Sequence, residues 1–137
     1  RSLMACDKTL SALLFEAACD HLARVKAGFD AQNGVTAHRV HRGLIASGDR
    51  FVSAAAQSAA LRRALRSAGH EALAVEMEGA AVAQVCLDYG VPFAAIRTIS
   101  DRADDQAHRD FKEFVSEVAS RYACAIMERV LRLLPEE

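Results

Sequence analysis

Two carboxylates, Glu76 and Glu78, flank Met77 where a short apolar run gives way to alanines. The apolar run is typical of a buried strand, and the alanines favour a helix, so both acids stand at a strand-to-helix junction. Charge at such a junction is costly unless it has a partner or a task. The first turn of a helix provides partners for an anion, because its free backbone N–H groups and its dipole favour negative charge.

Glu78 falls in that first turn and has two open interpretations. An acceptor held there can take hydrogen bonds from two neighbouring hydroxyls, as in a ribose diol, or it can simply cap the helix. Glu76 points to the opposite face of its strand from Met77, so it does not share all the surroundings of Glu78. Arg97 is a candidate cation for pairing with Glu76.

A second polar cluster, Ser100 and Asp101, follows the apolar run "PFAAIRTI". A carboxyl such as Asp101 can protonate a leaving group in a partly apolar pocket, although aspartate also caps turns and helices very often. A third cluster, "SGDRF", ends in Phe51. That ring can belong to the core, or it can be the plate on which a flat heterocycle stacks.

The elements that position these clusters follow from hydrophobic periodicity and from breaker residues. We predict strands over residues 40–46, 73–77 and 92–99, and helices over 7–25, 54–68, 78–89 and 111–134. Asp7 is placed to cap the first helix, while Gly69 and Gly90 are placed to end two others. The last helix carries an expected buried stripe of Phe114, Val115, Val118, Tyr122, Ile126, Val130 and Leu133.

Strands that alternate with helices indicate an α/β fold whose helices pack on a sheet that is at least partly parallel. In such sheets, ligands bind beyond the carboxyl ends of the strands. All three polar clusters directly follow predicted strands. One pocket could therefore collect them.

Composition excludes several classes of function. With 17 basic and 18 acidic residues the formal net charge is -1, which provides no footprint for nucleic acid or an anionic membrane surface. A small or neutral ligand fits better. No apolar run approaches the roughly 20 residues that a spanning helix needs, so we expect a soluble protein.

The four cysteines lie far apart and form no CxxC pair. Cys86 and Cys124 fall within apolar helical patterns, so we predict that both thiols are buried. Such thiols suit a reducing cytoplasm, and we therefore expect a cytoplasmic protein with neither a disulfide framework nor a bound metal.

Four segments carry a resemblance to a known family. They are "RGLIASGDRF" at 42–51, "AVEMEGAAVAQVC" at 74–86, "VPFAAIRTISDRAD" at 91–104 and "FKEF" at 111–114. The chain resembles the 5'-methylthioadenosine/S-adenosylhomocysteine nucleosidases of the nucleoside phosphorylase superfamily from about Asp7 onward. This implies a three-layer α/β/α fold with a mixed, twisted central sheet. Family members are longer, so residues 1–137 are expected to be the C-terminal portion of a single domain.

The resemblance also implies roles for individual residues. Asp101 matches the acid that protonates or hydrogen-bonds purine N7, with Ser100 as its supporting neighbour. Glu78 matches the glutamate that binds the ribose 2'- and 3'-hydroxyls. The other matches are Met77 against the sugar, Phe51 on adenine, Val52 at the base edge through its backbone, and Phe111 as a wall near the 5'-alkylthio group. Glu76 is expected to be structural or base-facing.

The implied reaction is hydrolysis of the bond between adenine and ribose in 5'-methylthioadenosine or S-adenosylhomocysteine, without a cofactor. The family's water-activating acid lies near the true N-terminus, so the resemblance implies a missing N-terminal portion. Family members also borrow part of the 5'-substituent pocket from a neighbouring subunit, so the resemblance implies a homodimer. Two alternatives remain. One is a purine nucleoside phosphorylase, and the other, if the chain is complete, is a non-catalytic nucleoside-binding module.

Overall fold

The computed structural model describes residues 3–29, 39–100, 103 and 120–134. In chain order these residues form α1 (Lys8–Phe29), β1 (Leu44–Ser47), α2 (Ala55–Ser67), β2 (Ala72–Glu76), α3 (Gly79–Asp88) and α5 (Ser120–Leu133). The predicted strands 40–46 and 73–77, and the predicted helices 7–25, 54–68 and 78–89, are confirmed with shifted bounds. No helix within these ranges is long and apolar enough to cross a bilayer.

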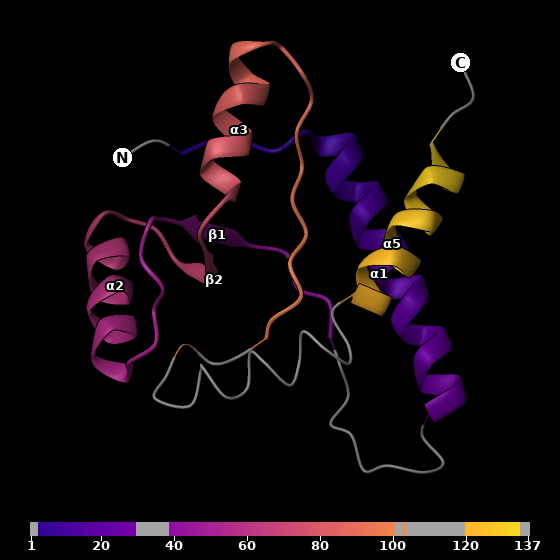
Figure 1. Cartoon of the computed structure of the whole chain (residues 1–137), viewed down its shortest axis with the longest axis horizontal. Helices are drawn as coiled ribbons and strands as arrows, with labels where there is room; N and C mark the ends of the chain where they lie inside the picture. The colour runs from indigo at the N-terminus through magenta and orange to yellow at the C-terminus, as the bar shows by residue number, and fades with distance from the viewer. Residues whose placement is uncertain (1–2, 30–38, 101–102, 104–119, 135–137) are drawn as a thin grey trace.

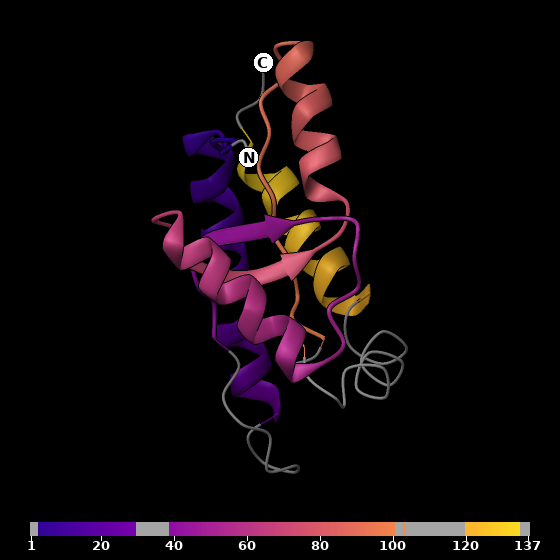
Figure 2. The same ribbon diagram turned by 90° about the vertical axis from the view of Figure 1, so that its left-hand side faces the viewer.

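The two strands pair in parallel, which confirms the predicted parallel character of the sheet. The chain passes from β1 through α2 to β2, and α2 lies on one side of the strands (Figure 1). The helices α1 and α5 lie on the other side, as the rotated view also shows (Figure 2). This layering agrees with the expected α/β/α fold.

Short-range hydrogen bonds fix the predicted helix ends. The Asp7 carboxylate accepts a bond of 2.8 Å from the backbone N–H of Leu10, which confirms Asp7 as a cap. Gly69 and Gly90 adopt positive φ angles of 78° and 65° beyond α2 and α3. The following amides bond back into each helix, as in the C-terminal motif that favours glycine. Three residues therefore fix three helix ends.

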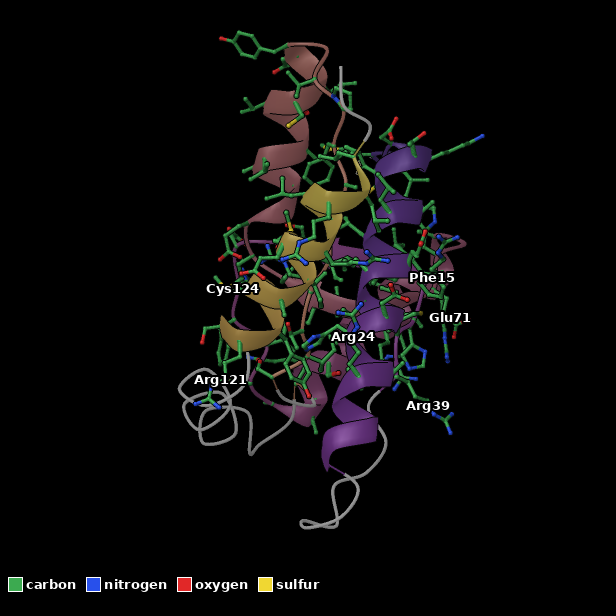
Figure 3. All side chains as sticks on the ribbon, turned by 90° about the vertical axis from the view of Figure 1, so that its right-hand side faces the viewer. Phe15, Arg24, Arg39, Glu71, Arg121 and Cys124 are labelled. Atoms are coloured by element: carbon green, nitrogen blue, oxygen red, sulfur yellow. The ribbon has the colours of Figure 1, made fainter. Side chains whose placement is uncertain are left out.

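The buried apolar core of the described residues lies mainly between α1 and α5, which run side by side (Figure 3). The cluster between these helices consists of Ala17, Ala18, Ile126 and Val130, against which Leu14, Val40 and Leu133 pack. The alanines of α1 have no long side chains to keep the helices apart, so the branched side chains of α5 reach the helix surface. Ile126 and Val130 confirm part of the predicted stripe.

The rest of that stripe divides into two groups. Tyr122 and Leu133 are half-buried. Phe114, Val115 and Val118, together with the first part of the predicted helix, lie outside the described residues. The prediction of a buried Cys124 was wrong, because its side chain is exposed. Cys124 precedes Ile126 by two positions, which turns it about 200° around the helix from the buried face.

The predicted strand at 92–99 is also wrong. Residues 91–100 have no regular secondary structure, and Ile99 is 59% exposed. A strand requires a neighbour that supplies alternating backbone donors and acceptors. Among the described residues this segment has no ladder partner, although the Phe93 carbonyl accepts a bond from the Asp7 N–H. Leu73 is likewise 58% exposed, so β2 is not the fully buried strand that was expected.

Candidate functional site

The parallel pairing brings the ends of β1 and β2 to the same edge of the sheet. Ser47, the last residue of β1, is the register partner of Glu76, the last residue of β2. The N–H of Gly48 donates to the carbonyl of Glu76 at 3.1 Å and extends this pairing by one step. The "SGDRF" and "EME" clusters therefore begin at the same place, as the sequence predicted.

The Glu76 carboxylate caps α3. The Gly79 N–H lies 2.9 Å from Oε1 and 2.8 Å from Oε2, and the Glu78 N–H lies 3.1 Å from Oε2. The Arg97 guanidinium forms an ion pair with the same carboxylate, which confirms the predicted partner. Only 10% of the Glu76 side chain is exposed. Glu76 therefore has a structural position in the described fold.

Ser47 completes this arrangement from the neighbouring strand. Its Oγ accepts a bond of 3.0 Å from the Ala80 N–H, and its hydroxyl bonds the Glu76 carboxylate. Partial burial pushes the pKa of Glu76 upward, but hydrogen bonds from Ser47, from the amides of Gly79 and Glu78, and from Arg97 outweigh it. The pKa of Glu76 therefore lies below its ordinary value, and the group is an anion at neutral pH.

Glu78 differs from Glu76 although it is only two residues away. It occupies the N-cap position of α3, yet its side chain makes no capping hydrogen bond. The side chain is 70% exposed, and its contact with the Arg97 guanidinium is long at 3.4 Å. Of the two interpretations of Glu78, the capping one does not describe this structure, because Glu76 performs that role.

A groove of about 750 Å³ is lined by β2, by residues of α2 and by residues just beyond the ends of both strands. Its walls include six of the eight predicted site residues, namely Phe51, Val52, Glu76, Met77, Glu78 and Ser100. Ligand pockets commonly have volumes of about 300–1,000 Å³, so the groove has room for a nucleoside. Two other predicted residues, Asp101 and Phe111, lie outside the described residues.

The groove presents both apolar and polar groups to a ligand. Phe51 and Met77 are 40% and 42% exposed, so part of each surface is available for contact. Glu78 adds an exposed carboxylate, and Arg97 lines the same groove. Such a mixture suits a ligand that has a flat apolar part and hydroxyl groups. Within the described ranges, no three His, Cys, Asp or Glu side chains gather as metal ligands would.

Two residues that shape the site were not predicted from the sequence. Ser47 was recognised only as part of a polar turn, although strand register makes it the neighbour of Glu76. Gly79 was not singled out, although its N–H contacts both carboxylate oxygens of Glu76. The available signal was the glycine directly after the second acid, because glycine allows a side chain to approach the backbone closely.

Several solved structures share the fold of this chain. S-adenosylhomocysteine nucleosidase from Streptococcus pyogenes is 32% identical, with a TM-score of 0.72, over 97% of this chain and 48% of that one. The 5'-methylthioadenosine/S-adenosylhomocysteine nucleosidase from Neisseria meningitidis is 35% identical, with a TM-score of 0.70, over 96% and 48%. Futalosine hydrolase from Helicobacter pylori is 30% identical, with a TM-score of 0.71, over 96% and 47%.

This chain thus spans about half the length of each of these structures. A sequence profile described as the phosphorylase superfamily matches residues 2–132, which is nearly all of the chain. By that match, and by the nucleosidase and hydrolase structures that share its fold, the chain belongs to the phosphorylase superfamily.

Proposed function

We propose that this protein hydrolyses the N-glycosidic bond of adenine nucleosides such as 5'-methylthioadenosine and S-adenosylhomocysteine, and releases adenine. The observation that carries the proposal is the exposed Glu78 carboxylate at the groove, relieved of helix capping by Glu76. The similarity to two nucleosidases and a futalosine hydrolase supports hydrolysis as the type of reaction.

At the sugar end, Glu78 accepts hydrogen bonds from the ribose 2'- and 3'-hydroxyls, and Met77 packs against the sugar. Each hydrogen bond to an ionised carboxylate is stronger than a neutral one. A diol donates two such bonds and a single hydroxyl donates one, so the diol is held more firmly. The exposure of both side chains in the groove supports these roles.

At the base end, adenine stacks on Phe51 and bonds the backbone of Val52. Asp101, supported by Ser100, protonates purine N7 and makes the base a better leaving group. Ser100 and Phe51 line the same groove, which supports a common base site. Asp101 follows Ser100 directly in the chain, so the acid is expected near that site.

The transition state of glycoside hydrolysis resembles an oxocarbenium ion. Asp101 neutralises the charge that develops on the departing base, while the anionic Glu78 favours the positive charge that develops on ribose. Water then attacks the anomeric carbon and takes the place of adenine. These steps need no metal ion or organic cofactor.

The remainder of the site lies beyond the described residues. Phe111 forms a wall near the 5'-substituent, and an acid in an N-terminal portion of the protein activates the attacking water. We further propose that the whole protein is a homodimer. The support for an additional portion is that the chain spans about half of each related structure.

The reaction is tested with the whole protein, 5'-methylthioadenosine and S-adenosylhomocysteine, in buffers with and without phosphate. We expect adenine and a free sugar in both buffers. Cleavage that requires phosphate and produces a sugar 1-phosphate would replace hydrolysis by phosphorolysis, which the superfamily's name makes the second candidate. Binding of nucleoside without cleavage in either buffer would favour a non-catalytic module.

The role of Asp101 has its own test. Asp101→Asn should lower kcat by about 100-fold or more, which is the usual scale of a general acid, while the thermal midpoint stays near that of the wild type. Asp88→Asn is the matched control, because Asp88 is the last residue of α3 and outside the groove. Near-normal turnover in Asp101→Asn would remove this residue from the mechanism.

A further inference from the structure

The Glu76 carboxylate has little capacity left for a ligand. A carboxylate offers about four lone-pair positions. Around Glu76 they face the N–H groups of Gly79 and Glu78, the Ser47 hydroxyl and the Arg97 guanidinium. A side chain that is 10% exposed and surrounded by these donors is directed toward the protein.

One of these donors, the Arg97 guanidinium, also contacts the other acid. Glu78 is the N-cap residue of α3, the position whose side chain normally accepts the free amides of the first turn. Its Oε2 already lies 3.4 Å from the Arg97 guanidinium. If Glu76 were withdrawn, the released Arg97 guanidinium and the positive end of the α3 dipole would attract the Glu78 carboxylate away from its present position.

We propose that Glu76 is a positioning residue, which keeps the Glu78 carboxylate at its place in the groove by occupying the cap of α3 and the Arg97 side chain. The proposal rests on the proposed function for the identity of what Glu78 binds, a ribose diol. It assigns Glu76 no contact with the substrate. Of the two roles expected for Glu76 from the sequence, it selects the structural one.

Gly79 offers a substitution that moves Glu76 without altering either acid. A Cβ added at Gly79 would lie 2.7 Å from Glu76 Oε1, 3.1 Å from Cδ and 3.2 Å from Oε2. Contacts this short force the carboxylate to move. Gly48 is the matched control, because a Cβ there meets nothing within 4 Å although Gly48 bonds the Glu76 carbonyl.

The experiment compares kcat/KM for a riboside and for its 2'-deoxy analogue in the whole protein. In Gly79→Ala we expect kcat/KM for the riboside to fall by about 100-fold, the scale of a misplaced catalytic group. The loss on the deoxyriboside should be about tenfold smaller, because that substrate makes only part of the diol contact. Gly48→Ala should change both values less than about twofold.

Carboxyl ¹³C titration of Glu76 provides a readout that does not depend on activity. Displacement of the carboxylate in Gly79→Ala should raise the pKa of Glu76 toward its ordinary value, because the amide hydrogen bonds that lower it are lost. A wild type that cleaves neither nucleoside would overturn the proposed function. An unchanged titration in Gly79→Ala would overturn the positioning proposal separately.

Two further outcomes are decisive. A folded Gly79→Ala protein with a displaced carboxylate and an unchanged riboside preference would also overturn the proposal. If Gly79→Ala does not fold, Ser47→Ala replaces it, because this change removes contacts to both Glu76 and the Ala80 amide. We then expect the riboside preference to fall by a few-fold, and an unchanged preference would contradict the proposal.

Discussion

The α1–α5 helix pair and the β2–α3 junction are held together by different forces. Between the helices, Ala17 and Ala18 pack against Ile126 and Val130 in an apolar cluster. At the junction, one carboxylate is fixed by two backbone amides, a hydroxyl and a guanidinium. The contact between the helices depends on the volume and buried area of the side chains. The junction depends on the direction of its hydrogen bonds.

This difference indicates which property each region controls. Apolar packing has little directional preference, so a change between the helices lowers stability without redirecting a distant side chain. Hydrogen bonds are directional, so a change at the junction redirects the adjacent Glu78 even where the fold survives. Substitutions in the two regions should therefore separate stability from substrate preference.

The largest expected effect on stability comes from Ile126→Ala. Ile126 is 8% exposed, and its truncation should lower the free energy of unfolding by about 2–4 kcal/mol through lost burial and a cavity. Denaturant unfolding measures this value. Met127→Ala is the control, because Met127 is adjacent and 45% exposed, and its change should stay within about 0.5 kcal/mol. A shifted riboside preference in Ile126→Ala would break the comparison.

A smaller effect with a distinct pH dependence is expected for Glu76→Gln. The loss of charge-assisted hydrogen bonds should lower the free energy of unfolding by about 1–2 kcal/mol at neutral pH. The folded-state pKa of Glu76 is lowered, so its contribution is complete above the unfolded pKa and disappears as pH falls through the folded value. The stability difference from wild type should therefore be constant from about pH 6 to 8 and shrink below about pH 4.5.

Thermal unfolding of both proteins across this pH range measures the effect. Glu71→Gln is a suitable control, because the Glu71 side chain is 73% exposed and its ion pair with Arg66 is solvated. In the control, the free energy of unfolding at neutral pH should fall by at most a few tenths of a kcal/mol. A difference between Glu76→Gln and wild type that grows toward acid pH would contradict the expected sign.

The smallest effect is expected for the ion pair at the edge of the helix pair. Arg129 contacts Asp20 at 2.9 Å, and the two side chains are 33% and 38% exposed. Solvent screening limits such a pair to about 0.2–1 kcal/mol. A double-mutant cycle with Asp20→Asn and Arg129→Gln should find a coupling in this range that decreases with added salt. A coupling well above it would mean that direction also matters between the helices.

The sequence predicted those elements whose signals are local. Asp7, Gly69 and Gly90 mark helix ends through contacts within a few residues, and all three were found as expected. The strand predicted at 92–99 failed because apolar composition does not supply a pairing partner. Cys124 was misplaced because its apolar neighbourhood was considered without its angular position on the helix.

The sequence by itself determined the motifs and the order of α1, β1, α2, β2 and α3, and it offered Arg97 as a candidate partner of Glu76. Only the tertiary structure decided which of two acids caps α3 and which faces the groove. Both are glutamates near the same helix start, so local propensity does not separate them. The parallel register does, because it places the Ser47 hydroxyl beside Glu76 and leaves Glu78 exposed beyond the end of the strand.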